Sequence, residues 1–469
     1  MYFGLFLIAL NAFKLWLARF LPLLGDEAYY NVWSKHPALS YVDHPPMIAW
    51  LHGLTNALSG QSEFGIRCMA VILILISTWL IYLTAKEAFG KKVAVASAVL
   101  FNLIPTYLAG GMFLTPEQPV IIFWLLSMYA AVKIIKAHEA KYWYLLGLGI
   151  GLGLLSKFPM LLFLPGLLIF LLLSKEHRYW LTKKEPYLAI ILAFLIFSPV
   201  IVWNISHHFP SLAHHGARLG SPNYLNNILY FLVLQFIMFS PPLFIFTVTR
   251  LRLTPDVSPD ATVKLITLTS IIPFLIFLLV SPITLVGGHW TSIVYPGMII
   301  LLCHDLVTNY PNPLRKFRII ANLIIIILIN ALFIGYYSFL YPIPEDFKGK
   351  AYTINYNLPK YIQEAKVDYV FSNQMGVASL VAFYGKTEVY MPKGMWRQFD
   401  IWGQPELKKG DSILYFAFDE SDAEKRLKPL FGSVKLDPQN RLFTKDSDIP
   451  IKTKVYIVKY FKGRSGQAL

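Results

Sequence analysis

Long runs of apolar residues constrain this chain more than any other feature of its sequence. Three of them are residues 66–84 (IRCMAVILILISTWLIYLT), 158–173 (FPMLLFLPGLLIFLLL) and 319–340 (IIANLIIIILINALFIGYYSFL). A helix needs about 17–25 predominantly apolar residues to cross a bilayer. Only 15% of the 469 residues are charged, whereas soluble domains average about 25%. The sequence therefore predicts an α-helical polytopic membrane protein and excludes a disordered chain.

The apolar segments predict about eleven membrane-spanning helices. The N-terminal run reaches GDEAYY without an A-x-A-like cleavage site, so we interpret it as the first span and not as a cleaved signal peptide. We place the spans near residues 2–22, 66–84, 93–110, 119–136, 143–156, 158–174, 187–203, 227–249, 265–281, 290–304 and 318–340.

The basic residues of the loops indicate the orientation of these spans. One set of alternate loops (85–92, 133–142, 175–185, 250–264 and 305–318) contains 16 Lys and Arg residues, whereas the other set contains three, Lys35, Lys157 and Arg218. Cytoplasmic loops are enriched in Lys and Arg. We therefore expect the first set to be cytoplasmic. Most of the net charge of +15 then reflects topology, and no nucleic-acid partner is implied.

The last 129 residues differ from the rest of the chain in composition. Residues 341–469 hold 20 basic and 15 acidic side chains, as a soluble domain does. Strands are predicted at 367–373, 387–391, 411–418 and 454–460, and helices at 357–366 and 420–431. We expect a transmembrane domain over residues 1–340 and a small α/β extracytoplasmic domain over 341–469. Cys68 and Cys303 lie in apolar segments and form no disulfide or metal motif.

The first outer loop, residues 25–65, is long and aromatic. Its segments 26–35 and 46–58 have helical apolar spacing but are too short to span a bilayer, so we expect two helices in the membrane interface. Aromatic side chains anchor such helices, and Tyr41 is one of several in this loop.

Four carboxylates at three places in the outer loops are candidate catalytic groups. Asp26 and Glu27 directly follow the first span, Asp43 precedes His44-Pro45-Pro46, and Glu117 precedes the fourth span. Each has a structural alternative, because Asp26 and Asp43 suit helix or turn caps and Glu117 suits the positive end of a helix dipole. The functional hypothesis is a general base or a ligand at the lipid surface.

The outer cations are candidate anion ligands. His44, Lys157 and Arg218 come from three different outer loops, and the planar Arg fork is suited to phosphate. Lys157 could instead snorkel to the interface. His214 and His215 belong to a histidine-rich loop that, with Asp43, is a weak candidate for metal binding, because paired histidines lack the i, i+4 spacing of helical ligands. His289 and Tyr295 lie near the outer end of the tenth span, where Tyr295 could also be part of an aromatic belt.

Several of these motifs resemble one family in both content and order. They are GDEAYY, YVDHPPM, TPEQP, GLGLLSKF, PVIVWN and GGHW…YP, and the C-terminal stretch ASLVAFYGKTEVY…WRQFDIW adds to them. The chain resembles the bacterial relatives of protein O-mannosyltransferases, in the GT-C superfamily that includes the aminoarabinose transferase acting on lipid A.

The resemblance implies roles for individual residues. Asp26 matches an acidic residue proposed as catalytic, and Lys157, Arg218 and Tyr295 match residues that hold a lipid phosphate. Asp43 and His44 stand where the aminoarabinose enzymes have Glu-Lys, and Glu117 stands where relatives commonly have Asp. Several relatives use a divalent cation, and nothing in this sequence establishes one.

The resemblance also implies an activity, a donor and a location. We expect a GT-C fold in a bacterial inner membrane, with the C-terminal domain and the active site outside the cytoplasm, acting as a monomer. The enzyme would move a sugar from a polyprenyl phosphate to lipid A, lipopolysaccharide or another envelope acceptor by inverting displacement. The alternatives are a protein O-mannosyltransferase and, in another class, a lipid or sugar transporter, which would favour inverted repeats.

Overall fold

The computed structural model describes residues 2–18, 23–217, 220, 224–251, 260–308, 321, 325–326, 328, 358–394, 397–417, 420–437 and 454–463. The chain divides into two compact units. The helical unit comprises Met1–Ala18, Leu39–Ile48 and Arg67–Phe339, and the mixed unit comprises Arg19–Ala38, Ala49–Ile66 and Leu340–Leu469. Much of the first outer loop thus belongs to the same unit as the C-terminal segment.

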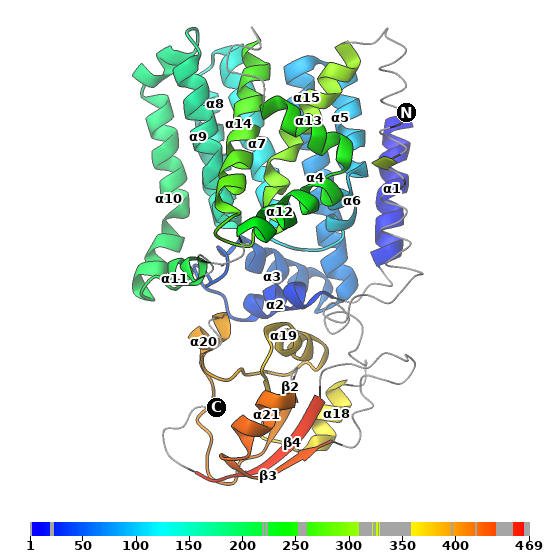
Figure 1. Ribbon diagram of the computed structural model, residues 1–469, viewed down its shortest axis with the longest axis vertical. Coiled ribbons are helices and arrows are strands. Elements are labelled where there is room, and N and C mark those ends of the chain that lie inside the picture. The colour runs from blue at the N-terminus through cyan, green and yellow to red at the C-terminus, as the bar shows by residue number, and fades with distance from the viewer. Residues whose placement is uncertain are drawn as a thin grey trace. The chain divides into compact units, whose positions relative to one another are not determined.

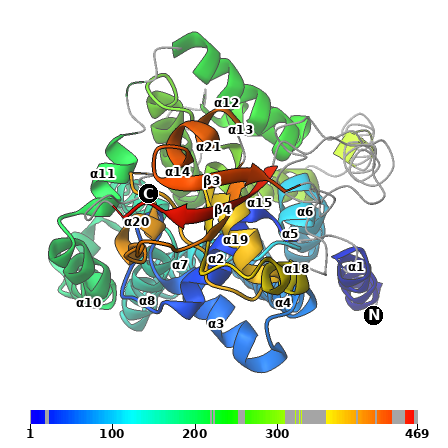
Figure 2. The same ribbon diagram turned by 90° about the horizontal axis from the view of Figure 1, so that it is seen from below.

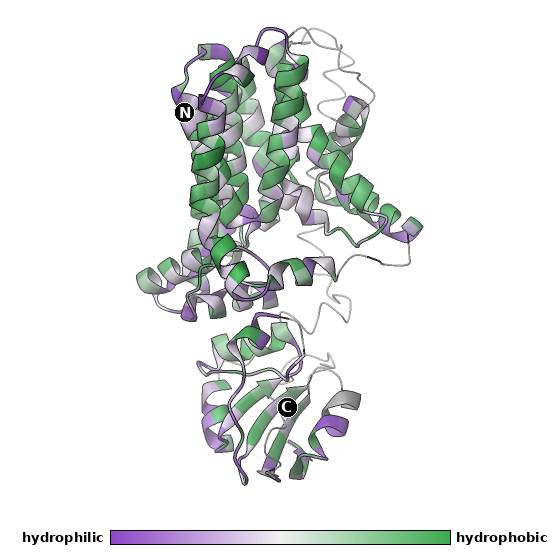
Figure 3. Ribbon diagram, turned by 90° about the vertical axis from the view of Figure 1, so that its left-hand side faces the viewer, coloured by the Kyte–Doolittle hydropathy of each residue, from purple (hydrophilic) through white to green (hydrophobic). Residues whose placement is uncertain are grey.

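The helical unit is a bundle of apolar helices (Figures 1 and 3). Its helices are α1 (Tyr2–Ala18), α4 (Glu63–Phe89), α5 (Lys91–Leu103), α6 (Pro105–Gly110), α7 (Glu117–Ala137), α8 (Lys141–Ser156), α9 (Phe163–Leu173), α10 (Glu185–Ser206), α11 (Pro210–Gly216), α12 (Tyr224–Met238), α13 (Pro241–Leu251), α14 (Ala261–Val280) and α15 (Tyr295–Thr308), with 3₁₀ turns η1 (Phe158–Leu162), η2 (Arg178–Thr182) and η3 (Gly288–Ile293). Within the described residues, α4, α7, α10 and α14 are long and apolar enough to cross a membrane. The chain therefore has membrane-embedded character, and α1, α12 and α15 are shorter apolar helices.

Proline breaks two of the predicted spans, and this corrects the sequence interpretation. The span expected over 227–249 is two helices, α12 and α13, separated at Ser240, where φ is 72°. Pro241 and Pro242 lack the N–H that a continuous helix requires, so the chain ends one helix and starts another. The span expected over 93–110 likewise divides into α5 and α6 at Pro105. The span expected over 318–340 lies mostly outside the described residues.

The mixed unit contains α2 (Gly25–Lys35), most of α3 (Met47–Ser59) and a four-stranded sheet with its helices. The C-terminal elements are α18 (Leu358–Ala365), β1 (Tyr369–Ser372), α19 (Met375–Tyr384), α20 (Gln398–Trp402), β2 (Ile413–Ala417), α21 (Glu420–Leu427), β3 (Phe431–Leu436) and β4 (Lys454–Phe461). The strand order is β1-β2-β4-β3, with β1 parallel to β2 and β4 antiparallel to both of its neighbours. In Figure 2, α19 and α21 lie on opposite sides of β3 and β4.

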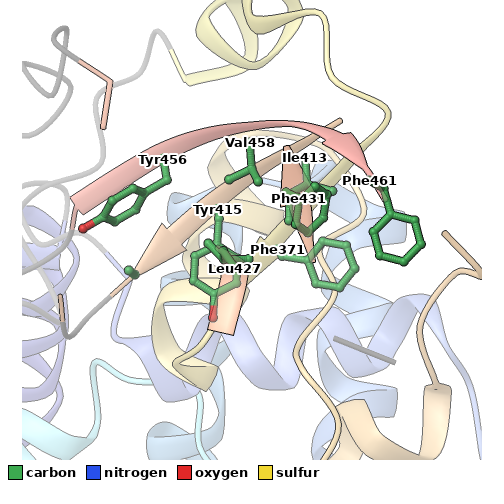
Figure 4. Packing of buried hydrophobic residues seen from close by; sticks show 9 residues of the cluster. Phe371, Ile413, Tyr415, Leu427, Phe431, Tyr456, Val458 and Phe461 are labelled. Atoms are coloured by element: carbon green, nitrogen blue, oxygen red, sulfur yellow. The ribbon is translucent and has the colours of Figure 1, made fainter. Parts of the chain in front are cut away.

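Apolar side chains of the strands form the core of this sheet. All five residues of β2 (ILYFA) are buried, which is typical of a central strand covered on both faces. Phe371, Tyr415 and Val458 pack with Leu427 of α21 and with Phe431 (Figure 4). Helix α19 follows β1 and contacts it, and both α19 and α20 contact α2 of the first outer loop.

Candidate functional site

Lys157 and Glu117 form an ion pair in the helical unit. Lys157 follows α8, where the backbone becomes extended (φ −163°, ψ 138°), and Pro159 lies in the next turn, η1. Glu117 is the first residue of α7, directly after Pro116. Only 5% of Lys157 is exposed. A lysine this buried is stabilised by a paired carboxylate, so the pair explains how the chain accommodates a cation here.

Glu117 also faces a histidine from the loop before α15. The Nε2 atom of His289, in η3, lies 3.6 Å from Oε1 of Glu117, and the imidazole is about half exposed. The start of α7, the end of α8 and η3 therefore bring Lys157, Glu117 and His289 together. All three are candidates from the sequence.

Asp43 and His214 form a second buried pair in the same unit. The Nε2 atom of His214, on α11, lies 3.3 Å from Oδ1 of Asp43. The Ser211 hydroxyl of α11 donates a hydrogen bond of 3.1 Å to the carbonyl of Tyr41, which is fully buried. Tyr41 therefore takes part in this contact through its backbone carbonyl. Helix α11 in this way holds the chain next to Asp43.

His44 links the two pairs electrostatically. Loss of solvation, with a further contribution from the Lys157 charge, lowers the pKa of His44 to about 3, against the opposing effects of Asp43 and Glu117. The imidazole is therefore neutral near pH 7. It offers hydrogen bonds to an anion but no net charge.

The histidine-rich loop does not gather a metal site among the described residues. No group of three or more His, Cys, Asp or Glu side chains in the described ranges is arranged to hold a metal ion. His214 is paired with Asp43, and the His215 ring packs edge-on against Phe158, with centroids 5.6 Å apart.

The structure describes one of the two remaining expected phosphate ligands, Tyr295. Arg218 lies outside the described residues. Tyr295 is fully buried, stacks on Phe239 with ring centroids 3.8 Å apart, and donates a 3.1 Å hydrogen bond to Oε1 of Gln235. The structure thus places the Tyr295 hydroxyl in a separate polar group.

Asp26 and Glu27 lie in the mixed unit, and their environments differ. Glu27 is fully buried, and its carboxylate accepts a 3.1 Å hydrogen bond from the Leu24 N–H, which caps the start of α2. Asp26 is exposed, although Gly25 and residues 27–33 of the same helix are buried. The structure therefore gives Glu27 a capping contact and leaves Asp26 the more accessible carboxylate.

Sequence reasoning missed polar residues that lie inside the apolar helices. Arg67 of α4 is fully buried, donates a 3.1 Å hydrogen bond to the Met112 carbonyl and lies 4.7 Å from the Phe113 ring centroid. These contacts support the loop that leads to Glu117. Gln235, also fully buried, contacts Thr291 and Tyr295. A polar residue within an apolar run is the signal that could have identified both.

The chain is similar in sequence to several named glycosyltransferases. The family described as dolichyl-phosphate-mannose-protein mannosyltransferase matches residues 43–203. A lipid A galacturonosyltransferase, RgtD of Rhizobium johnstonii, is 24% identical over 296 residues, which cover 62% of each chain. An undecaprenyl phosphate-α-4-amino-4-deoxy-L-arabinose arabinosyl transferase of Pseudomonas aeruginosa is 28% identical over 221 residues, 44% of this chain and 39% of that one. This chain therefore matches less than two thirds of the length of either relative.

The fold is shared with a solved enzyme. Crystal structures of ArnT from Cupriavidus metallidurans align over 97% of both chains at 12% identity, with TM-scores of 0.69 for the apo state and 0.66 for the state bound to undecaprenyl phosphate. In sequence, this chain is therefore similar to the family described as dolichyl-phosphate-mannose-protein mannosyltransferase, to the galacturonosyltransferase and to the arabinosyl transferase, and it shares the fold of ArnT.

Proposed function

We propose that this chain is an integral-membrane glycosyltransferase of the bacterial inner membrane that moves a sugar from a polyprenyl phosphate to lipid A, lipopolysaccharide or another envelope acceptor. The observation that carries the proposal is the buried Lys157–Glu117 pair at the ends of α7 and α8. A fixed cation where apolar helices end suits a ligand with an apolar tail and a phosphate head. The names of RgtD and of the arabinosyl transferases support the same donor and acceptor classes.

The donor phosphate would bind at Lys157. The ammonium can exchange its Glu117 partner for a phosphate oxygen, and a charge-assisted hydrogen bond of this kind is roughly twice as strong as a neutral one. The neutral imidazole of His44 can donate a further hydrogen bond, and Arg218 would add a second cation. These groups would stabilise the negative charge that develops on the departing lipid phosphate.

The acceptor would be activated by Asp26. In a single displacement, the acceptor oxygen forms a bond to the anomeric carbon while the bond from that carbon to the phosphate oxygen breaks, and the anomeric configuration inverts. The proton of the acceptor hydroxyl passes to the Asp26 carboxylate. General-base assistance of this kind contributes roughly 10²–10⁴-fold to a rate.

The reaction would take place on the outer face of the membrane. This orientation follows from the distribution of Lys and Arg, with 16 in the loops that we assign to the cytoplasm and three in the opposite set. Labelling of single cysteines introduced at Lys91 and at Pro37 tests it. Only the Pro37 position should react with an impermeant thiol reagent in intact cells.

The activity can be tested with the purified full-length protein in detergent. Sugars linked to undecaprenyl phosphate are offered with lipid A, and mass spectrometry follows both lipids. We expect a glycosylated lipid A and released undecaprenyl phosphate, with neither formed by the Lys157→Met variant. Transfer from a nucleotide sugar, without the lipid-linked donor, would contradict the proposal.

A protein acceptor is the second candidate, because the matching family is described as a protein mannosyltransferase. Mass spectrometry of lipid A, surface glycans and envelope proteins from cells with and without the gene separates the two. A change confined to Ser and Thr residues of proteins would favour this second candidate.

A further inference from the structure

Two helices of the mixed unit meet through glycines. Gly25 begins α2 and Gly376 lies in the first turn of α19, and a Cβ atom built on Gly25 would lie only 3.0 Å from the Gly376 Cα. A Cβ contact this short is tighter than most real ones, so a side chain on Gly25 would require the Gly376 backbone to shift by a few tenths of an ångström. The start of α2 is therefore packed directly against α19.

The other end of α19 holds both ends of the first outer loop. The Tyr384 hydroxyl accepts a 3.1 Å hydrogen bond from the Leu23 N–H, which precedes α2, and donates to the carboxylate of Glu63, which begins α4. The carbonyl of Phe383 accepts a 3.1 Å hydrogen bond from the Gln61 amide. One turn of α19 thus binds the chain before α2 and after α3.

A second C-terminal helix of the mixed unit, α20, contacts the middle of α2. The Gln398 N–H, at the start of α20, donates a 3.0 Å hydrogen bond to the Tyr29 hydroxyl, and the Phe399 ring stacks on Tyr29 with centroids 5.9 Å apart and an angle of 14°. The Trp402 ring lies against His36, just past the end of α2, at 4.6 Å between centroids. These contacts come from the sequence segments ASLVAFYG and WRQFDIW, to which the proposed reaction assigns no role.

The orientation of Asp26 depends on this packing. Helix α2 has 11 residues, and isolated helices shorter than about 12–15 residues are marginal in water. Gly25 and residues 27–33 are buried, and Asp26 is exposed. The surfaces that bury α2 therefore determine where the Asp26 carboxylate points.

We propose that Tyr384, with Gly376, is a positioning residue that holds α2 so that Asp26 is presented in a productive orientation. This inference rests on the proposed function, in which Asp26 is the general base. Tyr384 acts through the backbone at Leu23 and through Glu63, and it touches neither donor nor acceptor. The C-terminal elements of the mixed unit then contribute to catalysis indirectly, because α19 holds the loop that carries the general base.

The first test compares two Tyr→Phe variants of the full-length enzyme. Tyr384→Phe removes the hydroxyl that bonds to Leu23 and Glu63. We expect kcat to fall about 10- to 100-fold, because a misplacement of a catalytic group by about 1 Å can cost that much. The donor KM should stay within about twofold, because Lys157 and Glu117 lie in the helical unit. The matched control is Tyr361→Phe, whose hydroxyl bonds to Asp437 in the same unit and which should keep wild-type kcat. Wild-type kcat in Tyr384→Phe would overturn the inference.

Two glycine variants provide a second test, in case Tyr384→Phe folds poorly. Gly25→Ala introduces a Cβ atom 3.0 Å from the Gly376 Cα, at the crossing of α2 and α19, and it should lower kcat without changing the donor KM. Gly53→Ala, also in the mixed unit, places a Cβ at an ordinary 3.7 Å from the Ser34 Cβ and should have no effect. Equal kcat in the two glycine variants would contradict the proposal.

A double-mutant cycle separates positioning from general stability. In the Asp26→Asn background, the residual turnover should not fall further when Tyr384→Phe is added, because Tyr384 affects turnover by positioning Asp26. An additional loss equal to that of the single variant would show an independent structural effect and overturn the inference. Full activity of Asp26→Asn would instead remove the general base from the proposed function, whatever Tyr384→Phe does.

Discussion

The ammonium of Lys157 is held by the carboxylate of Glu117, and the two side chains are 6% and 17% exposed. Breaking a buried pair by removing one partner is strongly destabilising, because the other charge is left uncompensated. An anionic lipid head group that binds Lys157 therefore competes with Glu117. The imidazole of His289, whose Nε2 atom lies 3.6 Å from Oε1 of Glu117, would then remain as a neighbour that can hydrogen-bond to Glu117.

Neutralising Glu117 should strengthen donor-lipid binding. In Glu117→Gln the amide competes less with phosphate for Lys157, so we expect undecaprenyl phosphate to bind about fivefold more tightly, equivalent to about 1 kcal/mol. Titration of the purified variant with undecaprenyl phosphate measures this. Glu139→Gln, which alters the exposed Glu139–Lys141 pair, is the control and should bind as wild type. Weaker binding in Glu117→Gln would mean that Glu117 supports the donor directly.

Asp26 and Glu27 should respond differently to removal of their charge. Asp26→Asn removes the proposed base, so turnover should fall at least about 10²-fold with no change in thermal stability. Glu27→Gln keeps an oxygen that can accept the Leu24 N–H, so its turnover should stay within a few-fold of wild type. Glu27→Ala loses the cap and should cost about 1 kcal/mol of stability. Steady-state kinetics and melting temperatures of the three variants decide this, and inactivity of Glu27→Gln alone would reverse the assignment.

The local apolar character of its segments made the helical unit predictable. Segments such as 119–136 and 187–203 are recovered as α7 and α10, because a span is defined by local length and hydropathy. The breaks within spans were harder to predict, because α12 ends at Met238 and a second helix begins at Pro241 within the same apolar run. The buried Lys14 of the first span also had no account from sequence. Its Nζ atom lies 3.5 Å from both Asn102 Oδ1 and the Tyr107 carbonyl, partners that are distant along the chain.

The candidate site was predictable in its residue types but less so in its pairings. The loop sequences predicted Glu117, Lys157 and His289 as candidate site residues, and the structure brings the three together. The pairing of Lys157 with Glu117 is a tertiary contact that no spacing encodes. In the mixed unit, β1, β2 and β4 follow predicted strands, whereas β3 and α19 did not stand out, and residues 387–391 contribute a single bridge at Tyr390. The apolar run of α19 fits a helix or a strand equally well.

Acid should destabilise the protein partly through His44. Its pKa is 6.5 in the unfolded chain and about 3 in the folded one, so between these values the unfolded state binds more protons. Stability attributable to His44 is therefore complete above pH 6.5 and is lost as the pH falls toward 3, by at most about 1.4 kcal/mol per pH unit. Melting temperatures between pH 7.5 and 4.5 should fall less in His44→Gln than in wild type. Equal slopes would show that His44 titrates normally.

Tyr295 should contribute to stability more than to donor binding. Its hydroxyl donates to Gln235, which also accepts from Thr291 at 2.5 Å and whose amide lies 3.5 Å from the Gly288 carbonyl. Tyr295→Phe leaves Gln235 one donor, so it should cost about 1 kcal/mol of stability, with the donor KM within about twofold. Gln235→Leu leaves the buried Tyr295 hydroxyl without its acceptor, whereas the Thr291 hydroxyl keeps the Gly288 carbonyl, and it should cost more.

The control for Tyr295→Phe is Tyr187→Phe, which alters an exposed tyrosine and should change neither quantity. Melting temperatures give the stability effects, and initial rates at varied donor concentration give KM. A tenfold rise in donor KM in Tyr295→Phe at unchanged melting temperature would contradict this prediction. The hydroxyl would then reach the lipid phosphate, which requires Tyr295 to leave Gln235 when the donor binds.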